Sequence, residues 1–118
     1  MSRSCRIRIE TDALPAAAVL QGALKSLGFP LDLEGLEIAE ASGFQGCVLD
    51  GEDAGFSVAD DDEGLMLRWS GDPREECAAL MVAAALQSLA GAEVSIGGGA
   101  AQTAAALKSR VEELRAEI

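Results

Sequence analysis

Carboxylates are the side chains of this chain that are best able to do chemistry. Eleven of the 20 acidic residues lie within residues 26–67, a stretch that contains no lysine or arginine. They are Asp32, Glu34, Glu37, Glu40, Asp50, Glu52, Asp53, Asp60, Asp61, Asp62 and Glu63. Paired carboxylates can act as general acid and base, but no spacing in this stretch selects a pair. Residues 50–61 come closest to an EF-hand loop, yet Ala54 and Asp61 stand where that loop needs an oxygen ligand and a glutamate. We therefore expect no metal site.

Other catalytic side chains are scarce. The chain has no histidine and no tyrosine, and its three cysteines, Cys5, Cys47 and Cys77, are widely spaced. A cysteine nucleophile needs an activating base, and a zinc site needs clustered cysteine or histidine ligands. We predict a protein with no enzymatic activity and no cofactor. We further predict three buried, reduced thiols and a cytoplasmic location, because no secretion signal or membrane-spanning run is recognisable.

The negative charge is concentrated in the middle of the chain. The formal net charge is −11, and outside residues 26–67 the 9 basic residues balance 20 − 11 = 9 acidic ones. Such a field repels polyanions, which argues against nucleic acid and anionic membranes as partners. It attracts basic proteins and speeds their encounter.

This charge distribution predicts a small adaptor-like or inhibitor-like (immunity-like) domain that docks a basic protein partner through its acidic central hairpins. The predicted contact residues are Glu52, Asp53, Asp60, Asp61, Asp62 and Glu63. The competing interpretation is that these acids only keep the protein soluble.

A second hypothesis concerns three consecutive glycines, Gly97, Gly98 and Gly99. They lie between an expected strand and an expected helix, where backbone N–H groups can hold an anion at the helix N-terminus. The spacing is not that of a dinucleotide or P-loop motif, and no lysine follows. The alternative function is therefore a domain that binds a small anionic ligand.

The secondary-structure signals predict an α+β protein. Residues 4–10 alternate as in a half-buried strand, and Thr11 or Asp12 is expected to cap a helix that ends at Gly28. Alternating runs near residues 36–39, 46–49, 56–59 and 65–69 predict an antiparallel meander. Asp72 and Pro73 begin a helix that runs to about Ala90, and a strand and a last helix follow. The predicted fold is one domain, residues 1–118, with the order β-α-β-β-β-β-α-β-α and helices on one face of five to six short strands.

Two predictions concern the faces of these elements. The second helix is apolar almost all round in its middle, and the last helix carries an apolar seam. Because one small sheet face holds about two helices, we predict a homodimer with this seam in its interface. The seam consists of Leu107, Val111, Leu114 and Ile118. The open face of the sheet is expected to carry Arg6, Arg8 and Arg68, paired with Glu37 or another neighbouring acid.

Two short motifs suggest a family. The sequences GFQG at residues 43–46 and DAGF at residues 53–56 resemble motifs of a small family of uncharacterised proteins from algal plastids, cyanobacteria and other bacteria. The resemblance covers roughly residues 5–70, including a first helix that ends near Leu27 and Gly28. After that the chain departs from the family, because CAALMVAAAL stands where an aromatic-rich helix is expected. The resemblance implies a small α+β protein and supplies no catalytic residues.

Overall fold

The computed structural model describes residues 3–118, which form one antiparallel sheet of six strands and three α-helices. The predicted α+β class and the predicted order of elements are confirmed. The strands are β1 (Ser4–Arg8), β2 (Leu31–Asp32), β3 (Gly43–Leu49), β4 (Glu52–Asp61), β5 (Gly64–Arg68) and β6 (Glu93–Ile96). The helices are α1 (Ala17–Ser26), α2 (Pro73–Ala90) and α3 (Ala104–Glu117), with short 3-10 helices η1 (Thr11–Ala13) and η2 (Ile38–Glu40).

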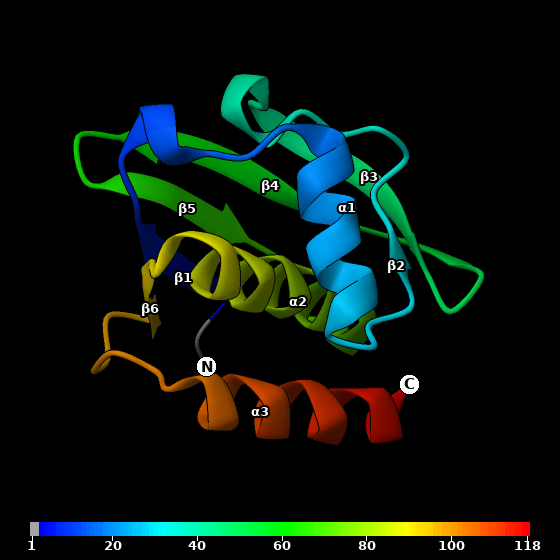
Figure 1. The fold of residues 1–118 in the computed structure, drawn as a ribbon. Coiled ribbons are helices and arrows are strands. Elements are labelled where there is room, and N and C mark those ends of the chain that lie inside the picture. The colour runs from blue at the N-terminus through cyan, green and yellow to red at the C-terminus, as the bar shows by residue number, and fades with distance from the viewer. Residues whose placement is uncertain (1–2) are drawn as a thin grey trace.

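The sheet has the strand order β2-β3-β4-β5-β1-β6, so β1 lies between the meander and β6. Helices α1 and α2 cover one face of the sheet, and no α-helix of residues 3–118 lies on the other face (Figure 1). Helix α3 runs alongside α2 in the opposite direction (Figure 1). No helix within residues 3–118 has the combination of length and apolarity needed to cross a membrane.

Helix α2 is the centre of the core. It begins where the sequence predicts, because Asp72 Oδ1 accepts a hydrogen bond from Arg74 N at 2.9 Å and Pro73 occupies the first helical position. It ends at Gly91, which adopts the left-handed conformation. Every side chain from Cys77 to Leu86 is buried, because α2 contacts strands on one side and both α1 and α3 elsewhere. The chain itself therefore covers the apolar helix.

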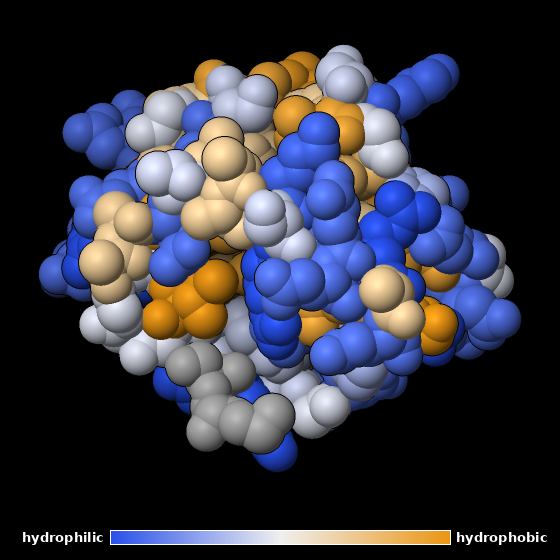
Figure 2. Space-filling model, turned by 90° about the horizontal axis from the view of Figure 1, so that it is seen from below, coloured by the Kyte–Doolittle hydropathy of each residue, from blue (hydrophilic) through white to orange (hydrophobic). Residues whose placement is uncertain are grey.

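The predicted dimer seam lies in the same core. Leu107 and Val111 are 0% exposed and Leu114 is 1% exposed within a single chain, whereas Ile118 is 42% exposed. The prediction that the first three form a dimer interface is therefore wrong, because they already pack inside the chain's own core beside α2. Figure 2 shows the side on which α3 lies: hydrophilic residues cover its middle, and the hydrophobic residues form small separate patches.

The segment between α1 and β3 differs most from the prediction. The expected strand at residues 36–39 is instead η2, and the strand of this region is β2. The reason is a turn at Glu34 and Gly35, whose φ angles of 54° and 79° redirect the chain. Leu36 N–H closes this turn by donating to the Leu33 carbonyl at 3.1 Å.

The start of α1 also differs from the prediction. The helix begins at Ala17 rather than directly after Thr11 or Asp12, and its N-cap residue, Ala16, has no side chain that can cap it. Glu37 compensates from the following loop, where its Oε2 accepts a hydrogen bond from Ala17 N at 3.2 Å. A carboxylate at a helix N-terminus is favourable, so Glu37 supports α1 and does not pair with the arginines of the sheet.

Candidate functional site

The predicted acidic docking residues lie at two opposite ends of β4. Glu52 and Asp53 follow the β3–β4 turn, whereas Asp60 to Glu63 form the β4–β5 end. Asp53 and Asp61 are 61 − 53 = 8 residues apart on one strand, which corresponds to about 26 Å at roughly 3.3 Å per residue. The two hairpin ends lie on opposite sides of the molecule (Figure 1). The six residues therefore do not form one surface.

At the β4–β5 end the acids are partly neutralised by β1. Arg6 Nη1 lies 2.7 Å from Asp61 Oδ2 and 3.5 Å from Glu63 Oε2. The hydrogen bond from Arg6 is the main cause that lowers the pKa of the Asp61 carboxyl below its ordinary value. The same contact raises the pKa of Arg6. This end of β4 is thus an ion-pair network as well as an acidic turn.

The Arg6–Asp61 pair predicts a contribution to acid sensitivity. Because the folded-state pKa of Asp61 is depressed, the pair stabilises the fold above the ordinary aspartate pKa of about 3.9, and this contribution is lost as the pH falls through the folded-state value. Urea denaturation at a series of pH values should show a shallower acid loss of stability for Asp61→Asn than for wild type. In Arg6→Gln, the carboxyl titration of Asp61 followed by NMR should move upward. An unchanged titration would contradict the assignment.

The open face carries the three arginines predicted for it. On β1, Arg6 and Arg8 alternate with buried Cys5 and Ile7, and Arg68 lies opposite Ser4 and Ser57. Arg8 pairs with Glu93 of the neighbouring strand at 3.2 Å. Arg68 forms no ion pair with any residue in the described range 3–118. Cross-strand pairing therefore accounts for two of the three arginines.

Phe44 is an exposed aromatic ring on this open face. It is 63% exposed, the highest value among the exposed large hydrophobic side chains of residues 3–118. Its ring lies over Gly55 of β4, where an added Cβ would overlap the ring and lie 2.8 Å from the Gln45 carbonyl oxygen. Gly46 lies directly opposite Gly55, so neither position has a side chain that could cover the ring. The Phe44 ring thus packs on the backbone of β4 and remains exposed to solvent.

Carboxylates surround one side of this ring. A hollow of about 380 Å³ is lined by Glu34, Phe44, Gly46, Cys47, Asp53, Ala54 and Glu75. Three of these residues are acidic and none is basic. We call Glu34, Phe44, Gly46, Asp53 and Glu75 the Phe44 corner. Arg68 lines a neighbouring hollow together with Phe44 and Glu75, so one cation borders the Phe44 corner on that side.

Different elements supply the acids of the Phe44 corner. Glu34 belongs to the turn after β2, Asp53 to β4 and Glu75 to the first turn of α2. Glu75 Oε1 accepts a hydrogen bond from Ser70 N at 3.0 Å, which fixes its position. Of these acids the sequence predicted only Asp53 as a contact residue. The opposed glycines of the GFQG and DAGF motifs are the signal that could have indicated an uncovered aromatic ring.

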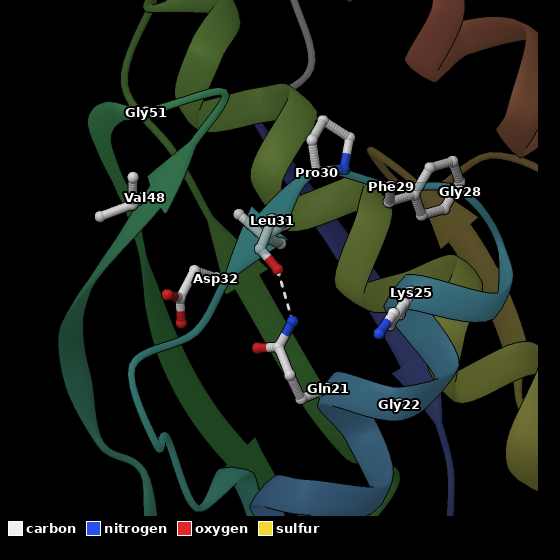
Figure 3. Close-up of a pocket in the computed structure, with 10 residues that line it drawn as sticks. All are labelled: Gln21, Gly22, Lys25, Gly28, Phe29, Pro30, Leu31, Asp32, Val48 and Gly51. Carbon is white, nitrogen blue, oxygen red and sulfur yellow. Dashed lines mark hydrogen bonds between the residues drawn. The ribbon is translucent and has the colours of Figure 1, made fainter.

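A hollow of about 590 Å³ lies between α1 and β2 (Figure 3). Gln21 reaches across it: its Nε2 donates to the Leu31 carbonyl at 2.7 Å (Figure 3), and its Oε1 accepts from Leu33 N at 2.9 Å. The side-chain amide thus takes the place of a neighbouring strand along the outer edge of β2. The Gln21 amide therefore connects α1 to the sheet across this hollow. Its two hydrogen bonds also occupy the outer edge of β2, which is then closed to another strand.

The three glycines of the second hypothesis form a turn rather than an anion cradle. Gly97 N–H donates to the Ser4 carbonyl at 2.9 Å and Gly99 N–H to the Ile96 carbonyl at 3.0 Å. Helix α3 begins only at Ala104, with Thr103 as its N-cap. The expectation that Gly97, Gly98 and Gly99 lie at a helix N-terminus is therefore wrong, because two of their amides are already used and the helix starts later.

The cysteines are free and buried. Burial raises the pKa of Cys5 to about 12 and is the main cause that raises the pKa of Cys47 and of Cys77 to about 11. Because the thiolate is the nucleophilic form, these thiols are poorly suited to attack a substrate at neutral pH.

The fold and the Phe44 corner together describe an α+β protein with an open sheet face and an acidic, aromatic corner. No family model matches the chain, and no curated protein or solved structure matches it either. The resemblance to the plastid and cyanobacterial family stays a prediction.

Proposed function

We propose that this protein is a non-enzymatic binding domain that docks a basic protein partner at the Phe44 corner. The observation that carries this proposal is the exposed ring of Phe44 beside Glu34, Asp53 and Glu75 in a hollow with no basic lining residue. Exposed aromatic residues are typical anchors of protein interfaces. A lysine or arginine can contact such a ring and a carboxylate at the same time.

The remaining charge favours a basic partner over an acidic one. Of the eleven acids in residues 26–67, Asp50, Asp61 and Glu63 form ion pairs, which leaves 11 − 3 = 8 without one within residues 3–118. Unpaired surface carboxylates steer a basic protein toward its site and repel acidic competitors. Such a domain would act as an adaptor or an inhibitor.

Two matched double variants test the proposal. Glu34→Gln with Asp53→Asn removes two charges from the Phe44 corner, and Asp60→Asn with Asp62→Asn removes two charges from the other end of β4. Basic proteins captured from a cell lysate at low salt are identified, and their association rates are measured with purified proteins. We expect the first double variant to slow association about tenfold and to flatten its salt dependence. The second should change the rate much less.

The results separate three interpretations. Equal slowing by both double variants would mean that the overall field, not the Phe44 corner, determines binding. Unchanged rates in both would leave the acids with a role in solubility only, and would refute the proposal.

A further inference from the structure

The edge of β3 is uncovered next to the Phe44 corner. Strand β3 has seven residues, but β2 pairs only with its last two, Val48 and Leu49. The turn at Glu34 and Gly35 carries the chain away before it can pair further along β3. The outer side of β3 therefore stays without a neighbouring strand over the stretch that contains Phe44 and Gly46.

The hairpin turn determines which backbone groups face this edge. Asp50 and Gly51, with φ angles of 52° and 79°, form a two-residue turn that makes Leu49 and Glu52 a hydrogen-bonded pair. Hydrogen-bonded and non-hydrogen-bonded pairs alternate along an antiparallel ladder. The N–H and C=O groups of Phe44 and Gly46 consequently point away from β4.

A second contact supports the same assignment. Asp50 N–H donates to the Pro30 carbonyl at 3.0 Å, so the even-numbered residues of β3 face the β2 side. Among residues 3–118, no hydrogen bond on that side reaches the main chain of Phe44 or Gly46. These backbone donors and acceptors are therefore open to a partner.

We propose that an extended, basic segment of the partner protein adds to the sheet as a further strand along this edge of β3. The inference rests on the binding function proposed above and specifies how the partner is held. Main-chain hydrogen bonds to Phe44 and Gly46 would fix the segment. Every second side chain of the segment would lie on the sheet face that carries Phe44 and Asp53.

Charge complementarity decides the identity of the occupant. A second copy of this chain would bring another net charge of −11 and another Phe44 corner to the same edge. Like charges directly opposite each other across strands are destabilising. Lysine or arginine at alternate positions of a foreign segment meets the carboxylates instead. The other sheet edges are not comparable, because Gln21 covers β2 and a bridge from Ser95 to Ala101 covers β6.

The test uses synthetic peptides of defined chemistry. The probe is a seven-residue peptide of alternating valine and lysine with blocked ends. It is compared with a glutamate-for-lysine version and with an N-methylated lysine version that keeps the charge but has no backbone donors. Binding is measured by NMR titration and calorimetry, and amide exchange of Phe44 and Gly46 is followed in the complex.

Gly46→Pro is the matching variant in the protein. It removes the outward N–H, and proline is tolerated where an edge N–H faces solvent. Gly46→Ala keeps the N–H and serves as the control. We expect Gly46→Pro to bind about tenfold more weakly than Gly46→Ala, N-methylation to weaken binding of wild type about tenfold, and the lysine peptide to slow exchange of both amides.

Two other outcomes are distinguishable: one overturns strand addition alone, and the other overturns the proposed binding function as well. In the first, the protein binds the lysine peptide more tightly than the glutamate peptide, but neither N-methylation nor a folded Gly46→Pro variant changes the affinity. This result would refute strand addition and leave the proposed binding of a basic partner intact. A lysine peptide that binds no more tightly than the glutamate peptide would refute both. If Gly46→Pro does not fold, the N-methylated peptide and the amide exchange decide the question on wild-type protein.

Discussion

Replacement of Gly64 by alanine is expected to lower the free energy of unfolding by about 3 kcal/mol. Gly64 begins β5 at a φ of 130°, a conformation that L-residues rarely adopt. A Cβ there would overlap the carbonyl oxygen of Ile7 and lie 2.8 Å from Ile9 N. Both atoms belong to the backbone of the neighbouring chain segment, so neither can rotate out of the way. Urea denaturation followed by circular dichroism measures the loss.

Gly51→Ala is the matched control for this prediction. Gly51 also lies in a hairpin turn with a positive φ, 79°, but an added Cβ would meet nothing within 4 Å. Only the left-handed conformation is then penalised, which costs about 1 kcal/mol. Equal losses in the two variants would mean that the close approach of β1 to β5 at Gly64 is not a constraint.

Local signals in the sequence were sufficient for most of the elements. Asp72 and Pro73 begin α2 because capping depends only on neighbouring residues. The alternation around Cys5 and Ile7 also predicts the correct buried face of β1. The expected strand at residues 36–39 does not form, because the chain turns at Glu34 directly before it. Glutamate has no obvious preference for positive φ, so this turn was not predicted. The strand of this region is β2, which lies before the turn.

The candidate site was harder to predict, because it depends on which residues meet in space. The acids were correctly recognised as an unusual concentration of charge, but β4 separates them into two groups. Arg6 and Arg115, both far away in the sequence, neutralise Asp61 and Asp50. Phe44 has no role in the sequence-based prediction, because its exposure follows from Gly55 on the neighbouring strand and from a sheet face that no α-helix of residues 3–118 covers.

The apolar helices illustrate the same limit. A helix that is apolar all round fits either a central core position or a subunit interface, and periodicity alone does not separate the two. Here α2 lies between the sheet, α1 and α3, so a single chain buries every side chain from Cys77 to Leu86. The apolar seam of α3 is likewise buried within one chain, because α3 packs beside α2.

Replacement of Leu107 by alanine is therefore expected to destabilise the single chain by about 3 kcal/mol. Leu107 is fully buried in the core that α3 shares with α2, and its removal would leave a cavity that the surrounding side chains fill only in part. Since the contact lies within one chain, the denaturation midpoint of wild type and variant should not depend on protein concentration. Thermal and urea denaturation over a hundredfold range of concentration measures both quantities.

Leu89→Ala provides the control, because Leu89 lies near the end of α2 and is 42% exposed. Its replacement should cost less than about 1 kcal/mol, as expected for a partly exposed surface position. If the denaturation midpoint of wild type rises with protein concentration and that of Leu107→Ala does not, Leu107 lies in a subunit interface. Such a result would require α3 to leave its place beside α2, because no other arrangement exposes Leu107, Val111 and Leu114 to a second copy.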